Sequence, residues 1–98
     1  MKLTREQIHR KVIAKYGRRL QLMIFIEETA ELIKEMIREL RQKGNTDKTI
    51  ERIADAEIMV EQLKIIYNCH HQVEEVKNLK LARLNERIDN DSSEFRPI

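Results

Sequence analysis

The sequence has few of the residues that characterise disulfide-bonded, aromatic-rich or membrane-spanning proteins. Its 98 residues include one cysteine, one proline, two glycines, four aromatic residues and no tryptophan. A single cysteine excludes a disulfide within the chain. There is no signal-peptide pattern and no apolar run of the roughly 20 residues that a membrane-spanning helix needs. We therefore expect a soluble, cytoplasmic protein that does not enter a membrane.

Charge is what the sequence has in abundance, and the two signs are mixed. Nineteen basic and seventeen acidic residues leave a net charge of +2. This balance does not indicate nucleic-acid binding, which usually requires a clustered basic face, and four aromatic residues offer little for base stacking. With 41% apolar residues and little of the β-branched and aromatic mixture typical of strands, the composition favours an all-α protein.

Apolar periodicity and capping signals predict four helices. We expect them from the capping box of Thr4 and Gln7 to Gly17, from Arg18 to about Lys43, from about Asp47 to Tyr67, and from about Gln72 to Ile88. Gly44 is a good residue to follow the second helix, and Asn45 to Asp47 offer an N-cap for the third. Residues 1–89 would then form one helical domain and residues 90–98 a polar C-terminal tail.

The short connections between these helices favour antiparallel neighbours. The simplest architecture is an antiparallel four-helix bundle with the second and third helices as its central hairpin. Their apolar faces are wider than one copy can bury, so we expect a homodimer or a homotetramer.

The segment IEETAELIKE, residues 26–35, concentrates carboxylates on one helix. At about 100° per residue, Glu28, Glu31 and Glu35 share one edge, beside an apolar stripe. This stripe consists of Ile26, Ile33, Ile37 and Leu40. Taken alone, such an edge is usually solvated and paired with basic residues on neighbouring turns.

Asp55 changes this interpretation because it lies within the apolar arc of the third helix. An ionised carboxylate there is costly unless it is paired or metal-bound. In a hairpin that turns near Gly44, Asp55 lies at a height similar to that of Glu31 and Glu35. Converging carboxylates repel one another unless a hard cation neutralises them, and oxygen-only ligands suit Mg²⁺ or Mn²⁺.

The remaining titratable residues of interest have simpler interpretations. Glu57, Glu61 and Lys64 fall within one sector of about 60° on the third helix, which we take as its solvent side. We expect His9 to be a surface or packing residue and Cys69-His70-His71 to be a loop at a helix break.

Two motifs carry a family resemblance. Gln21…Glu27-Glu28-Thr29-Ala30-Glu31, followed by Ile53-Ala54-Asp55, resembles the MazG-like, all-α nucleoside triphosphate pyrophosphohydrolases, whose signature is EExxE and then ExxD on the next helix. The resemblance covers roughly Gly17 to Ile88. It includes LKLARLNERI, residues 79–88, which is similar to the basic closing helix of short phage- or prophage-type members. It implies a MazG-type fold completed by oligomerisation.

The resemblance also implies a reaction and a set of roles. Glu28, Glu31 and Asp55 would hold Mg²⁺, which binds a nucleoside triphosphate and positions water for cleavage to a nucleoside monophosphate and pyrophosphate. Glu27 could orient that water beside Glu28, and Gln21 would line the nucleotide pocket. The phosphate-neutralising residues would be Lys77, Lys80, Arg83 and Arg87, which align along one edge of the fourth helix.

One position departs from the family pattern. Arg52 stands where ExxD has its glutamate, and the nearest acid is Glu51. Either Glu51 replaces the missing ligand, or Arg52 pairs with Glu28 or Glu31 and occupies the place of the metal. The second possibility predicts a noncatalytic helical interaction protein that retains the scaffold. A third, less favoured function is nucleic-acid binding through the fourth helix.

Overall fold

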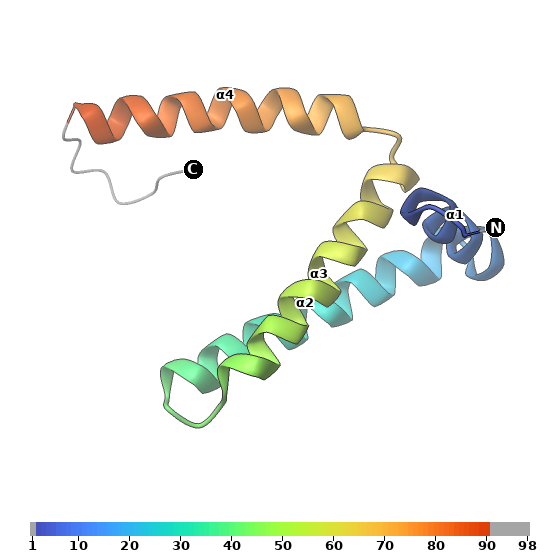
Figure 1. Cartoon of the computed structure of the whole chain (residues 1–98), viewed down its shortest axis with the longest axis horizontal. Helices are drawn as coiled ribbons and strands as arrows, with labels where there is room; N and C mark the ends of the chain where they lie inside the picture. The colour runs from blue at the N-terminus through green and yellow to red at the C-terminus, as the bar shows by residue number, and fades with distance from the viewer. Residues whose placement is uncertain (1, 91–98) are drawn as a thin grey trace. The chain divides into compact units, whose positions relative to one another are not determined.

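The computed structural model describes residues 2–90, and over that range it consists of four α-helices and no strand. Figure 1 shows α1 (Arg5–Tyr16), α2 (Arg18–Leu40), α3 (Thr46–Ile66) and α4 (His70–Asp89). The predicted all-α class is confirmed. The predicted polar tail lies, beyond Asn90, outside the described residues.

The helix starts follow the capping signals. The Gln7 amide donates to Thr4 Oγ1 at 3.1 Å, and the Thr4 amide donates to Gln7 Oε1 at 2.8 Å, so the predicted capping box opens α1. At the start of α3, the Lys48 amide donates to Asn45 Oδ1 at 2.9 Å. The cap predicted between Asn45 and Asp47 is therefore Asn45 itself.

The end of α2 differs from the prediction. The helix stops at Leu40 rather than near Lys43, and the left-handed residue is Gln42, with φ 60°, rather than Gly44. The Lys43 and Gly44 amides both donate to the Arg38 carbonyl oxygen, which closes the helix early. α4 likewise begins two residues before the predicted Gln72 and ends one residue after Ile88.

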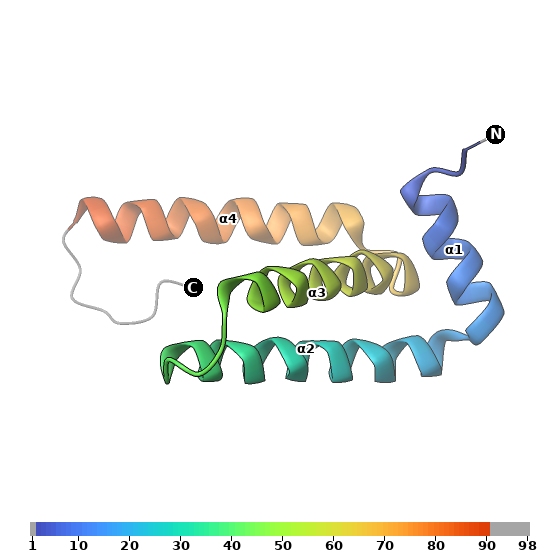
Figure 2. The same ribbon diagram turned by 60° about the horizontal axis from the view of Figure 1, so that its bottom comes forward.

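The chain divides into two units, residues 1–68 and residues 69–98. In the first unit, α2 and α3 form the predicted antiparallel hairpin, and α1 packs at the end of the hairpin away from its loop (Figure 2). In the second unit, α4 contributes no buried residue. None of the helices in the described part of the chain combines the length and apolar character that a membrane-spanning segment needs.

The side of α2 that faces α3 mixes polar residues with half-buried apolar ones such as Phe25 and Leu32. Gln21, Glu28 and Glu35 recur at seven-residue steps along it, and both Gln21 and Glu35 are buried. Met59 on α3 is the one buried apolar residue within residues 2–90. The expectation that the apolar stripe lies beside the acidic edge was wrong, because the stripe is on the other side of α2, where it is exposed. One copy of the first unit therefore leaves the apolar stripe of α2 uncovered.

Candidate active site

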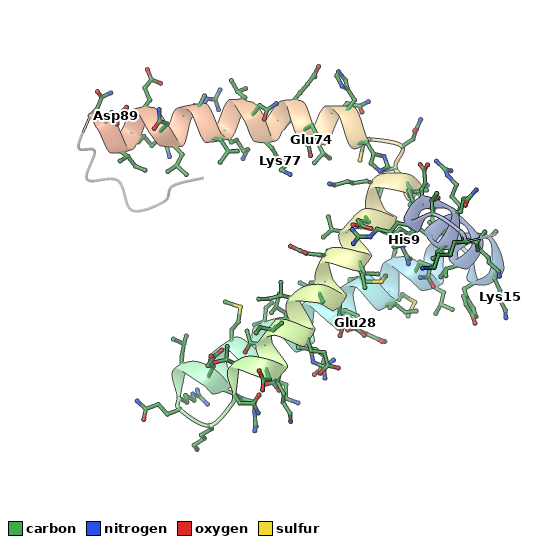
Figure 3. The ribbon with its side chains drawn as sticks, viewed as in Figure 1. His9, Lys15, Glu28, Glu74, Lys77 and Asp89 are labelled. Atoms are coloured by element: carbon green, nitrogen blue, oxygen red, sulfur yellow. The ribbon has the colours of Figure 1, made fainter. Side chains whose placement is uncertain are left out.

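Three of the predicted metal-ligating residues come together on the α2–α3 hairpin. Arg52 Nη1 lies 3.9 Å from Glu28 Oε2 and 3.6 Å from Asp55 Oδ2, and Arg52 Nη2 lies 3.9 Å from Glu31 Oε2. We call Glu28, Glu31 and Asp55 the carboxylate cluster. Figure 3 shows Glu28 on α2 beside α3. The convergence that the sequence predicted for Glu31 and Asp55 is thus present, and it includes Arg52.

The register of the hairpin explains why these residues meet. Gln21 Nε2 donates to Gln62 Oε1 at 2.7 Å, which pairs α2 with α3 near their joint with α1. One seven-residue step along α2 and one back along α3 lead from this pair to Glu28 and Asp55. Seven residues make about two helical turns, so the same faces meet again at that level.

The cluster is half-buried, and its charges are incompletely satisfied. The side chains of Glu28, Glu31 and Asp55 are 31%, 43% and 36% exposed. The three distances to Arg52 are too long for hydrogen bonds, so the guanidinium is held by charge alone. Within the described residues, the buried oxygen Glu28 Oε2 has no hydrogen-bond partner. A buried carboxylate oxygen without a donor is an open acceptor for a cation.

The chemistry of the cluster fits a hard divalent ion, but Arg52 lies among the ligands. Three carboxylates are the oxygen-only donors that Mg²⁺ and Mn²⁺ prefer. Across residues 2–90, no three histidine, cysteine, aspartate or glutamate side chains form a ready-made metal-binding group. As they stand, the three carboxylates are therefore not assembled as a metal site, and an ion held by them would have to take the place of the guanidinium.

The other predicted acidic residues lie at the margin of the cluster or beyond it. Glu27 and Glu51 are exposed, and neither is among the carboxylates that Arg52 contacts. Glu35, on the same edge of α2, is buried with Oε1 3.9 Å from Arg38 Nε, while its Oε2 has no hydrogen-bond partner among the described residues.

Gln21, expected to line the nucleotide pocket, is buried between α2 and α3. Its amide nitrogen is bound to Gln62, and its oxygen Oε1 has no hydrogen-bond partner within the described residues. In this conformation the side chain joins the two helices and keeps one acceptor available.

The basic residues predicted to bind phosphate all lie on α4. Lys77, Lys80, Arg83 and Arg87 follow one edge of that helix, and Lys77 Nζ is 3.2 Å from Glu74 Oε1. The helical spacing that aligned them in the sequence is therefore present.

A second polar contact was missed from the sequence. His9 is buried between α1 and α3, and its Nε2 donates to Glu61 Oε2 at 2.6 Å, while Arg5 Nη1 lies 3.4 Å from Glu61 Oε1. The labelled His9 in Figure 3 lies on the side of α1 that faces α3. The expectation that Glu61 is on the solvent side was wrong because α1 packs there. The available signal was that His9 shares a helical face with Val12 and Ile13.

This contact changes the acidity of Glu61 and borders a hollow. The hydrogen bond from His9 lowers the pKa of Glu61 below its ordinary value of 4.5, and the charges of His9, Arg5 and Lys64 add to the effect. Beside the pair is a cavity of about 470 Å³ between α1 and α3, whose apolar lining includes Ile8, Val12, Ala54 and Ile58. α1 is therefore attached to the hairpin by a polar contact next to incomplete packing.

Comparison with protein-family models, with curated proteins and with solved structures yields no match for this chain. A functional proposal therefore depends on the motif residues and on the geometry of the carboxylate cluster.

Proposed function

We propose that this chain is a small Mg²⁺-dependent nucleoside triphosphate pyrophosphohydrolase of the MazG-like type. It would convert ribo- or deoxyribonucleoside triphosphates to the monophosphate and pyrophosphate. The observation that carries the proposal is the meeting of Glu28 and Glu31 of α2 with Asp55 of α3 around the Arg52 guanidinium, together with a buried oxygen of Glu28 that lacks a hydrogen-bond partner among the described residues. These are the positions that the resemblance assigns to the metal.

Some residues of the chain would hold the ion and neutralise charge, and others would position the water and the nucleotide. The cluster would hold Mg²⁺ or Mn²⁺, with Glu51 as a further ligand after a change of rotamer, and the ion would neutralise charge that develops on phosphoryl oxygens. Glu27, exposed next to Glu28, would orient the attacking water. Gln21, buried against α3, would have to turn out of the hairpin to reach the nucleotide. The resemblance assigns the anchoring of phosphate oxygens to Lys77, Lys80, Arg83 and Arg87 of α4.

The MazG-type fold would be completed by a second or further copies of the chain. The apolar stripe of α2 points away from α3 and is exposed along its length. Exposed apolar surface of this extent is typical of a protein interface. We therefore propose a homodimer, or a homotetramer built from it.

Arg52 favours a second candidate function. Its contacts with all three carboxylates resemble the case in which a guanidinium permanently replaces the metal. A guanidinium neutralises acids but cannot act as a Lewis acid on water or phosphate. The chain would then be a noncatalytic helical interaction protein that retains the scaffold.

The products of nucleotide turnover distinguish the two functions. With Mg²⁺ and a panel of nucleoside triphosphates, the enzyme releases pyrophosphate, so inorganic phosphate is detected only after inorganic pyrophosphatase is added. Glu28→Gln, Glu31→Gln and Asp55→Asn should each lower the rate by about a hundredfold or more, because each removes a ligand of the charge-stabilising ion.

The matched control is Glu6→Gln, which removes a carboxylate from α1 that pairs with Arg10. It should turn over nucleotide at the wild-type rate. Phosphate release without pyrophosphatase, or equal rates in the control and the cluster variants, would refute the proposed reaction. No turnover of any nucleotide by a folded wild type would favour the interaction protein.

A further inference from the structure

Arg52 is the counter-ion of three acids at once. This suggests a role other than permanent replacement of the metal. We propose that Arg52 is a displaceable internal cation. It occupies the carboxylate cluster in the metal-free protein, yields that place to a divalent ion, and turns its guanidinium to the phosphates of the bound nucleotide. The part that concerns phosphate rests on the proposed function, whereas the exchange with metal does not.

The contacts of Arg52 are suited to exchange. All three lie between 3.6 and 3.9 Å, beyond hydrogen-bonding distance, so no directed bond must break before the guanidinium moves. Its side chain is 34% exposed and therefore already borders solvent. A guanidinium pairs equally well with carboxylates and with phosphates, and a triphosphate offers it a new partner.

The charges explain why metal and guanidinium exclude each other. The three carboxylates carry a charge of −3, which Arg52 reduces to −2 and a divalent ion in its place would reduce to −1. The ion and the guanidinium need the same oxygens, Glu28 Oε2, Glu31 Oε2 and Asp55 Oδ2. Two cations forced into this space would repel, so binding of one drives the other out. Metal affinity in the wild type is therefore reduced by the work of displacing Arg52.

The exchange is tested by titrating Mn²⁺ alone into the full chain and following the signal of free Mn²⁺ by electron paramagnetic resonance. Arg52→Gln should bind Mn²⁺ about tenfold more tightly than wild type, which is within the usual range of coupling between two ligands. Arg38→Gln is the control, because it removes another guanidinium of the same hairpin that lies 3.9 Å from a carboxylate, that of Glu35. It should bind Mn²⁺ as wild type does.

Circular dichroism of the same samples shows whether Arg52→Gln is folded with and without Mn²⁺. If Arg52→Gln is unfolded without metal and folds on addition of Mn²⁺, the ion replaces the guanidinium and the proposal is supported. If Mn²⁺ does not restore its fold, Arg52 is not displaceable. Equal Mn²⁺ affinity in folded wild type and Arg52→Gln overturns the exchange.

A second titration tests the contact with phosphate. With Mn²⁺ at saturating concentration, a nonhydrolysable nucleoside triphosphate should bind Arg52→Gln about tenfold more weakly than wild type, so one substitution shifts metal and nucleotide affinities in opposite directions. Equal nucleotide affinity in the two proteins would show that the Arg52 guanidinium does not contact the phosphates. If neither protein binds the nucleotide, the proposed function fails, while the Mn²⁺ titration still decides the exchange.

Discussion

At the scale of single residues, the interior of the α2–α3 hairpin contains polar oxygens that its own donors do not satisfy. Gln21 Oε1, Glu28 Oε2 and Glu35 Oε2 are buried and have no hydrogen-bond partner within the described residues. An unsatisfied buried polar group costs about 1–3 kcal/mol, so three of them are a burden on a small domain. On the proposed function a bound cation would satisfy Glu28 Oε2, but it would leave Glu35 Oε2, which lies outside the cluster, unsatisfied.

At Glu35, which lies outside the cluster, the cost of a poorly paired buried carboxylate to the free energy of unfolding can be measured. Its carboxylate is buried and has only a 3.9 Å contact with Arg38. Glu35→Met should therefore raise the free energy of unfolding, by about 1 kcal/mol or more, because a methionine of similar size removes a poorly paired buried charge. Urea denaturation followed by circular dichroism measures the change.

Glu27→Met is the control for Glu35, because it removes an exposed carboxylate from the same helix. Its unfolding free energy should differ from the wild-type value by no more than about 0.5 kcal/mol. A lower stability of Glu35→Met would show that the Glu35 carboxylate is well paired and would contradict the account of the hairpin interior.

Glu61 predicts a pH dependence of stability. Its pKa is lowered in the folded chain by the hydrogen bond from His9, so the contact stabilises the fold above the ordinary value of 4.5 and is lost as pH falls through the lowered pKa. Glu61→Gln should therefore be less stable than wild type near about pH 6, and the difference should shrink toward about pH 3. Urea denaturation at both pH values measures it, and a difference that grows on acidification would contradict the assignment.

At the scale of helices, Gly17 sets the angle at which α1 leaves the hairpin. It is the only residue between α1 and α2, and its φ of 88° and ψ of 157° lie in a region that is essentially restricted to glycine. The Gly17 amide donates to the Ile13 carbonyl oxygen at 2.8 Å. This sharp joint lets α1 turn back so that His9 reaches Glu61 on α3.

Gly17→Ala should lower the free energy of unfolding by about 1–3 kcal/mol. The reason is backbone strain alone, since a Cβ at this position would meet no atom within 4 Å. Gln42→Gly is the counterpart in the loop between α2 and α3, where a non-glycine residue has φ 60°. This substitution should be neutral or stabilising. Thermal unfolding of both variants checks the signs. An unchanged melting temperature for Gly17→Ala would show that the joint can relax.

Helix boundaries that depend on contacts within one helical turn were predicted correctly from the sequence, whereas a boundary that depends on contacts across a loop was missed. The starts of α1 and α3 were predicted because Thr4, Gln7 and Asn45 cap within their own turns. The end of α2 was missed because Glu39 binds the hydroxyls of Thr46 at 2.8 Å and Thr49 at 2.7 Å, which ties the loop to the helix across the turn.

The same reasoning applies to the candidate site. The meeting of Glu31 with Asp55 follows from helical periodicity and one tight turn, both of which can be read from the chain. The contact between His9 and Glu61 depends on how α1 is placed after Gly17, which periodicity does not specify. The central place of Arg52 was one of two alternatives left open by the sequence, and the side-chain geometry favours it.

At the scale of the whole molecule, the account requires association of chains. Within residues 2–90 only one apolar residue is buried, while the apolar stripe of α2 is 45–83% exposed. An apolar surface of this kind is stabilised by burial against a partner at roughly 25 cal/mol per Å² of apolar area. A second copy is the partner that the proposed family fold supplies.

Substitution within the stripe tests this association. Ile33→Lys should shift the assembly to single chains, because a charge at the centre of an apolar interface is left unpaired. The control is Leu3→Lys, an exposed residue ahead of α1, which should leave the assembly unchanged. Sedimentation equilibrium measures the mass. A wild type that sediments as a single chain at high concentration would contradict the proposed oligomer.

The central claim is that the carboxylate cluster binds a metal–nucleotide complex, and isothermal titration calorimetry tests it most directly. A nonhydrolysable nucleoside triphosphate is titrated into wild type with Mg²⁺, into wild type with a chelator, and into Asp55→Asn with Mg²⁺. The account predicts binding to wild type only when Mg²⁺ is present, and affinity weakened by about tenfold or more in Asp55→Asn. Binding of equal strength with and without Mg²⁺, or no binding to wild type under any condition, would contradict it.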